Sequence, residues 1–151
     1  SMGEYDVVRK VLQAAGEVVF WKVKQQPGGP LLLARLGGLP ILGLPGNPVS
    51  SMVTFFLYGR PFLFRLQRRT DPPYRSLEAR ALTPFKGAQG KKVFRRGVIS
   101  FEGELVVRTT GSQSSGVLRS MALGNALVVL PPGQDAREGE RVEVIPLTFV
   151  L

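Results

Sequence analysis

Apolar and polar positions follow two different periods along the chain. From residue 5 to residue 15 the apolar side chains recur at close to helical spacing, and Gly16 follows as a C-cap. Strands are predicted at residues 17–23 and 31–36, separated by a turn over 24–30, and the apolar run 39–44 reads as a buried strand. Helix, strand, hairpin, strand is an order typical of one half of an α/β layer fold.

The stretch 39–67 is the one around which this half is organised. Its strand ends in the turn Pro45-Gly46-Asn47-Pro48, where Asn47 is a good N-cap and Pro48 a good first helical residue. Backbone N–H groups at such a helix start lie beside the positive end of the helix dipole and can bind an anion. A well-capped turn without any ligand explains the same residues, so both interpretations stay open.

The helix that follows is apolar on most sides up to Leu63, which predicts burial on most sides. We expect a kink or break at Arg60-Pro61, because proline removes a backbone donor and clashes with the preceding turn. The interruption also excludes a membrane span, which needs about 20 unbroken apolar residues.

Beyond Thr70 the pattern changes to short strands separated by turns. The linker TDPPY places a domain boundary near residue 72, giving units 1–71 and 72–151. Strands are predicted at 76–82, 93–102, 104–109, 126–130 and 141–150, with a hairpin turn at Glu102-Gly103 and one helical turn within 111–123. This spacing indicates a small β-barrel or sandwich.

The amino-acid composition limits the kinds of catalytic, metal and binding site that the chain can form. The chain has no cysteine and no histidine, which excludes disulfides, thiolate metal sites and histidine-based catalysis. Any metal must be held by oxygen ligands, which favours magnesium. The net charge of +9 attracts anions such as phosphates, nucleic acid or an anionic cofactor. The basic residues are scattered without interleaved aromatics, which speaks against nucleic acid, and no signal peptide is seen, so the cytoplasm is expected.

Five motifs occur in a fixed order: SMGEYD, WKVKQQPGGP, GLPGNPVSS, TTGSQSSG and ALGNALVVLP. Together they resemble the C-terminal part of MoeA-type molybdopterin molybdenumtransferases, including the related E domain of gephyrin. The resemblance covers essentially the whole chain. It implies the second half of a molybdopterin-binding, MogA-like α/β domain followed by the C-terminal β-barrel domain. The family's upstream regions are expected to be absent.

The resemblance also implies a function. The family joins molybdate to adenylylated molybdopterin and releases AMP with the help of Mg²⁺, and the intact protein is expected to be a homodimer. This chain alone is expected to lack turnover. Two other hypotheses stay open: a non-catalytic module that binds molybdopterin or a protein, and a basic nucleic-acid-binding domain.

Site residues follow from the matched motifs. Asp6 aligns with a family acidic residue that serves the metal and pyrophosphate; a helix cap is the alternative explanation. Ser50 and Ser115 align with residues that act on the substrate, Ser115 near molybdate. The remaining positions implied in pterin or anion binding are Gly46, Asn47, Pro48, Lys91 and Gln113.

Two departures from the family pattern bear on molybdate binding. Where the family has KPGKP, this chain has Gln26 and Gly29 in place of the two lysines, and a nearby family arginine is matched by Lys91 or Lys92. Lys22 and Lys24 could compensate, or they could form a solvated strand edge. The loss of two cations favours the binding-module hypothesis slightly.

Overall fold

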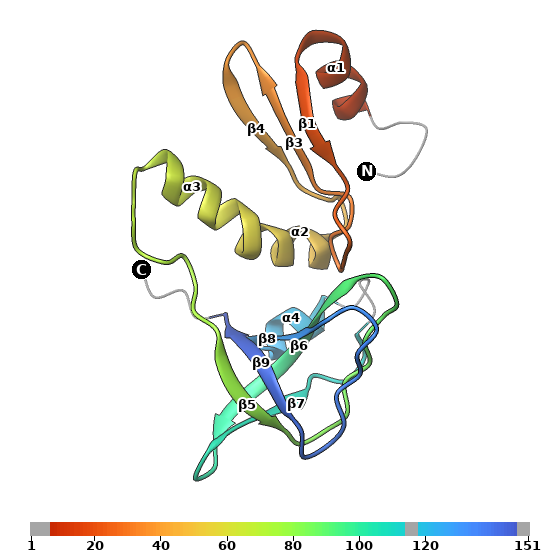
Figure 1. Cartoon of the computed structure of the whole chain (residues 1–151), viewed down its shortest axis with the longest axis vertical. Helices are drawn as coiled ribbons and strands as arrows, with labels where there is room; N and C mark the ends of the chain where they lie inside the picture. The colour runs from red at the N-terminus through yellow and green to blue at the C-terminus, as the bar shows by residue number, and fades with distance from the viewer. Residues whose placement is uncertain (1–6, 114–117, 148–151) are drawn as a thin grey trace.

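The computed structural model describes residues 7–113 and 118–147 (Figure 1). Helix α1 (Val7–Ala15) leads into an antiparallel sheet of β1 (Glu17–Trp21), β3 (Leu32–Leu36) and β4 (Leu39–Gly43), with β3 in the centre. Leu12 of α1 packs with Leu32 and Ala34 of β3 in a small core. The helix therefore covers one face of this sheet.

One long helical run follows the turn at Pro45 and continues past Pro61. It comprises α2 (Pro48–Thr54), a π-helical segment η1 (Phe55–Gly59) and α3 (Arg60–Leu66). The expected break at Arg60-Pro61 is wrong, because the helix instead widens just before the proline, with the Arg60 N–H donating to the Phe55 carbonyl. A π turn gives the pyrrolidine ring room that a regular α-turn lacks.

The second half of the chain forms a closed barrel. Its strands follow the order β6 (Lys92–Phe101), β7 (Leu105–Thr109), β5 (Leu77–Ala81), β9 (Arg141–Pro146) and β8 (Ala126–Leu130). The ring closes because β8 also pairs with β6, which leaves no free edge between these five strands. The barrel interior is filled mainly by small and β-branched side chains, namely Ala79, Ala81, Val93, Val107, Val128 and Val144.

The helical run lies against the outer surface of the barrel (Figure 1). Val49, Val53 and Phe56 share one buried cluster with Phe94 of β6 and Leu127 of β8. The predicted domain boundary at residue 72 falls in the segment between α3 and β5 and stays a prediction.

The fold class expected from the sequence is confirmed: part of an α/β domain precedes a small β-barrel, and the sandwich alternative is wrong. One local expectation is also wrong. Within the predicted turn 24–30, β2 (Gln25–Gln26) pairs in parallel with Lys92 and Val93 of β6. No described helix is long and apolar enough to cross a membrane.

Candidate functional site

The Pro45–Ser50 turn caps α2 as the sequence predicts. Asn47 has an extended backbone (φ −71°, ψ 128°), and its Oδ1 accepts a hydrogen bond of 3.2 Å from the Ser50 N–H. Pro48 opens the helix, and the Ser51 hydroxyl donates to the Pro45 carbonyl. Gly46 is exposed, and no atom lies within 4 Å of where its Cβ would stand. The turn is thus held from within, while open space lies in front of Gly46.

The QPGGP loop is pressed against the same helix. A Cβ on Gly28 would lie 2.2 Å from Cγ2 of Thr54, so only glycine allows this approach. The Thr54 hydroxyl donates to the Ser50 carbonyl over 2.7 Å, and the Tyr58 hydroxyl donates to Oε1 of Gln25. Because Ser50, Thr54 and Tyr58 follow one another at i, i+4 and i+8, the loop docks along one helix face.

Gln25, the residue just before the QPGGP loop (residues 26–30), binds both the loop and the helix. Its Nε2 donates a 3.0 Å hydrogen bond to the Pro27 carbonyl, and the side chain is buried. On its other side, the Lys92 N–H donates to the Lys24 carbonyl over 3.0 Å. The strand pairing of β2 with β6 therefore brings the exposed Lys91 beside the start of this loop.

Gln113 binds the TTGSQ segment, residues 109–113, to strand β6. Its Oε1 accepts from the Arg96 N–H over 2.9 Å, and its Nε2 donates to the Arg96 carbonyl over 3.0 Å and lies 3.1 Å from the Thr109 hydroxyl. These contacts give Gln113 a structural role in fixing the TTGSQ segment. Its predicted role in cofactor binding stays a prediction.

Arg96 is a buried cation that the motif comparison missed. Its side chain is 1% exposed, and its Nε donates to the Ser120 hydroxyl over 3.0 Å. Burial, followed by repulsion from Arg95, lowers the pKa of Arg96, but an arginine stays charged at neutral pH. Gln113 therefore binds the backbone of Arg96 while the Arg96 side chain is bound by Ser120, and Lys91 lies beside the QPGGP loop. The alternation along β6, which puts residues 94 and 96 on one face, was the available signal.

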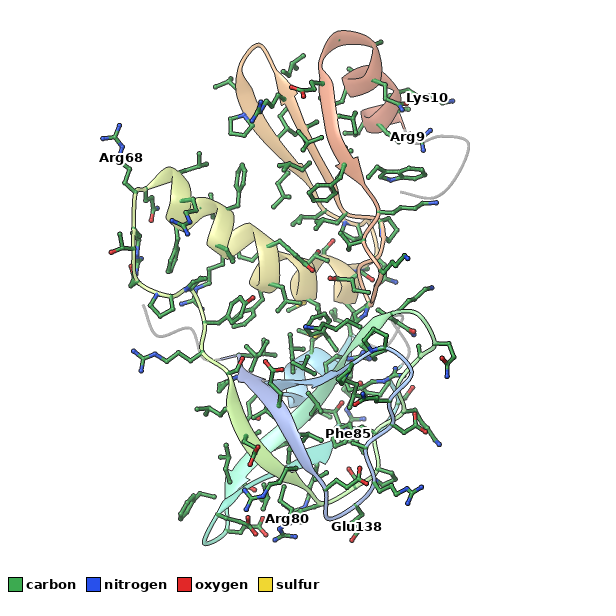
Figure 2. The ribbon with its side chains drawn as sticks, viewed as in Figure 1. Arg9, Lys10, Arg68, Arg80, Phe85 and Glu138 are labelled. Carbon is green, nitrogen blue, oxygen red and sulfur yellow. The ribbon has the colours of Figure 1, made fainter. Side chains whose placement is uncertain are left out.

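Two of the predicted site residues, Asp6 and Ser115, lie outside the described residues. The solvated strand edge considered for Lys22 and Lys24 does not form, because β1 ends at Trp21, Lys22 is left-handed with φ 75° and Lys24 precedes β2. The Lys22 ammonium instead lies 4.1 Å from the centre of the Trp21 ring, and the Arg9 guanidinium lies 3.9 Å from it. Figure 2 shows Arg9 and Lys10 on α1.

Within residues 7–113 and 118–147, no group of three or more His, Cys, Asp or Glu side chains is placed to hold a metal ion. The site defined by the described residues is therefore one of hydrogen-bond donors and cations. Its members come from the turn at α2, the QPGGP loop and the start and middle of β6. Such a set suits anions more than metal cations.

Comparison with known proteins gives the same picture. Residues 78–147 match the family model for the MoeA C-terminal region (domain IV), and residues 1–65 match that for a probable molybdopterin binding domain. The chain is 34% identical to the molybdopterin molybdenumtransferase of Haemophilus influenzae, covering 100% of this chain and 38% of that protein. It is 35% identical to molybdopterin molybdenumtransferase 2 of Mycobacterium tuberculosis, covering 98% of this chain and again 38% of the relative.

A solved MoeA structure from Pyrococcus horikoshii superposes with a TM-score of 0.77 at 27% identity, covering 95% of this chain and 35% of that one. The chain thus spans little more than a third of the length of the proteins that it matches. The two family models together account for nearly all of it, in the order found in these relatives. Residues 78–147 thus form a MoeA C-terminal region, residues 1–65 form part of a molybdopterin binding domain, and the chain as a whole resembles the C-terminal part of MoeA proteins, as its motifs predicted.

Proposed function

We propose that the whole protein is a molybdopterin molybdenumtransferase, which inserts molybdate into adenylylated molybdopterin and releases AMP. The relatives that carry this name support the proposal. The observation that carries it is the contact of Gly28 with Thr54, which fixes the QPGGP loop against the helix that begins at Pro48. Two segments of anion-binding character are thereby held in one place.

In this proposal the described residues act as donors and positioning groups. Molybdate and the pterin phosphate are oxyanions, so they need N–H, hydroxyl and cationic partners. Ser50 and Ser115 supply hydroxyl donors. At the turn Gly46-Asn47-Pro48 an oxyanion can approach the backbone closely. Lys91 supplies a cation beside the QPGGP loop. Gln113 contributes through pterin contact as well as by holding the backbone of Arg96.

Magnesium is a further part of the proposal, and it concerns Asp6. Among the described residues, no group of three or more His, Cys, Asp or Glu side chains is placed to hold a metal ion. Magnesium is commonly bound by one or two carboxylates together with substrate phosphates, and Asp6 is our proposal for one such carboxylate. In the whole protein, Asp6→Asn should lower turnover by about 10²-fold or more while pterin affinity changes little. Normal turnover at limiting magnesium would refute this role.

A homodimer of the intact protein and a cytoplasmic location are also proposed. Both rest on the family resemblance alone. Sedimentation of the full-length protein tests the first, and fractionation of cells tests the second.

A non-catalytic module that binds molybdopterin or a protein partner is the alternative function. It is favoured by Gln26 and Gly29, which stand where the family has cations. A nucleic-acid-binding domain has only the net charge of +9 in its support.

The deciding experiment measures AMP release and molybdate insertion by the full-length protein. Ser50→Ala should lower turnover by about 10²-fold if its hydroxyl stabilises a developing charge. Ser76→Ala is the matched control, because Ser76 is an exposed serine of the barrel whose hydroxyl donates to Glu143 of β9. Tight pterin binding without AMP release in the wild-type protein would instead establish the binding-module alternative.

A further inference from the structure

A pocket lies toward the C-terminal end of the helical run, away from the Pro45–Ser50 turn. It has a volume of about 460 Å³ and lies between α3, the linker to β5 and the end of β9. Arg60 lies about 18 Å along the helix from Pro48, at a rise of about 1.5 Å per residue. The pocket shares no residue with the QPGGP loop or with the turn at Ser50. It is lined by Arg60, Arg69, Asp71, Pro72, Pro73, Tyr74, Arg75, Leu77 and Pro146.

The charges in this pocket are unbalanced. Three arginines line it against one acidic residue, Asp71, which leaves an excess of two positive charges. Asp71 is bound by Arg69 through two hydrogen bonds of 2.9 and 2.5 Å. The bond from Arg69, and more weakly the field of Arg60, lower the pKa of Asp71, so this carboxylate is ionised at neutral pH. The excess of two positive charges is therefore the resting state.

The guanidinium groups are held by aromatic rings. The Arg69 guanidinium carbon lies 3.8 Å from the centre of the Phe64 ring, and that of Arg60 lies 5.4 Å from the same ring and 5.6 Å from the Phe56 ring. Stacking of this kind restricts a long side chain, so less conformational entropy is lost when a ligand binds.

The remaining wall is apolar and stiff. Pro72, Pro73 and Pro146 contribute rings with fixed backbone φ, and Leu77 is 46% exposed. Tyr74 is fixed by stacking on Phe56, with 5.9 Å between ring centres and 26° between planes. The pocket thus combines an apolar wall with charged side chains that carry an excess of two positive charges.

We propose that this pocket binds an organic phosphate whose phosphate group contacts Arg69 and Arg75 and whose ring lies on the proline and leucine wall. A phosphate monoester carries close to two negative charges at neutral pH, which matches the excess of two. A carboxylate would leave one guanidinium charge uncompensated. The volume is within the range of pockets that hold small organic ligands.

The test measures binding of phenyl phosphate to the full chain by calorimetry, with inorganic phosphate as the comparison probe. Phenyl phosphate should bind about tenfold more tightly than inorganic phosphate, because its ring is removed from water. Equal affinity for the two probes would overturn the role of the apolar wall and with it the proposal.

Arg75→Gln should weaken phenyl phosphate binding about tenfold through loss of one charge-assisted hydrogen bond. Arg68→Gln removes the same charge and is the matched control, since Arg68 projects away from the linker at the end of α3 (Figure 2). Equal weakening by both variants would show attraction by net charge alone and overturn the proposal. Arg69→Gln provides a second variant, checked by thermal melting because it also releases Asp71.

Resonances of Tyr74 and Leu77 should shift on titration with phenyl phosphate. Shifts confined to the Gly46 turn would place the ligand at the other anion site and contradict the pocket assignment. The outcome is independent of the proposed transferase activity, because Ser50→Ala should change turnover and leave phenyl phosphate binding at this pocket unchanged.

Discussion

The Tyr58 hydroxyl donates a hydrogen bond to Oε1 of Gln25, which joins the π-helical segment η1 to the QPGGP loop. Since Gln25 also donates to the Pro27 carbonyl, one side chain holds both the loop and its attachment to the helix. The π turn therefore does more than make room for Pro61. It also carries Tyr58, which holds the loop that is expected to face the substrate.

Tyr58→Phe should destabilise the chain by about 1–2 kcal/mol, because the buried amide of Gln25 loses its donor. Urea denaturation followed by tryptophan fluorescence measures the change. Tyr74→Phe is the control, since the described residues show no hydrogen bond from the Tyr74 hydroxyl and its loss should cost less. Equal effects of the two substitutions would contradict the importance of the Tyr58–Gln25 bond.

Alkaline pH should unfold the chain partly through these tyrosines. Burial raises the pKa of Tyr58 above its ordinary value, with a smaller contribution from Tyr74, and burial likewise raises the pKa of Tyr74. Above about pH 10 the unfolded chain releases these protons first, so the free energy of unfolding falls as pH rises toward the folded-state pKa values. Below that pH the two groups contribute no slope.

Denaturant midpoints measured between pH 8 and pH 11 test this expectation, and Tyr58→Phe should make the decline shallower. If the decline is as steep in Tyr58→Phe as in the wild type, then Tyr58 is not one of the groups responsible.

Gly28→Ala should destabilise the chain by more than about 2 kcal/mol. Its backbone has φ 90°, and the new Cβ would stand 2.2 Å from Cγ2 of Thr54. Gly37→Ala is the matched control: its φ is 55° and nothing lies within 4 Å of its Cβ, so only the backbone cost of about 1 kcal/mol applies.

Combining Gly28→Ala with Thr54→Ser removes the clashing methyl group while keeping the hydroxyl that donates to Ser50. The double variant should recover part of the stability lost in Gly28→Ala. A double variant no more stable than Gly28→Ala alone would show that backbone strain, and not contact with Thr54, sets the cost.

The sequence predicted those features that depend on neighbouring residues. The capped turn at Asn47, the hairpin at Gly103 and the barrel strands all have local signals: a cap, a turn residue or an alternation. The family motifs also identified the two units and their order, which local patterns alone do not reveal.

What the sequence could not predict depends on contacts between distant segments. The pairing of Gln25 with Lys92 joins one residue from each half of the chain, and a strand of only two residues has no recognisable sequence pattern. Arg96 was missed because its burial depends on helix α4 (Arg119–Leu123), which supplies Ser120 as its hydrogen-bond partner. The left-handed Lys22 likewise ends β1 earlier than its apolar run suggested.

The strongest test of the QPGGP loop is to return its missing cations. The structure has room for them: Gln26 is exposed, and a Cβ on Gly29 would meet only ordinary contacts, at 3.4 Å from the Gln25 carbonyl oxygen and 3.6 Å from that of Val23. In the full-length protein, Gln26→Lys with Gly29→Lys should tighten molybdate binding about tenfold, since two cations return beside a dianion. The gain should shrink at high salt, because screening weakens exposed charges.

Gln13→Lys with Gln134→Lys is the control for this experiment, because both glutamines are exposed and the net charge rises by the same amount. Molybdate affinity measured by calorimetry should rise in the loop variant and stay near the wild-type value in the control. If the two variants behave alike, the loop does not face the molybdate site, and its match to the family's lysine-bearing loop carries no functional meaning. A gain confined to the loop variant would mean that the loop keeps the geometry of a molybdate site and lacks only its charge.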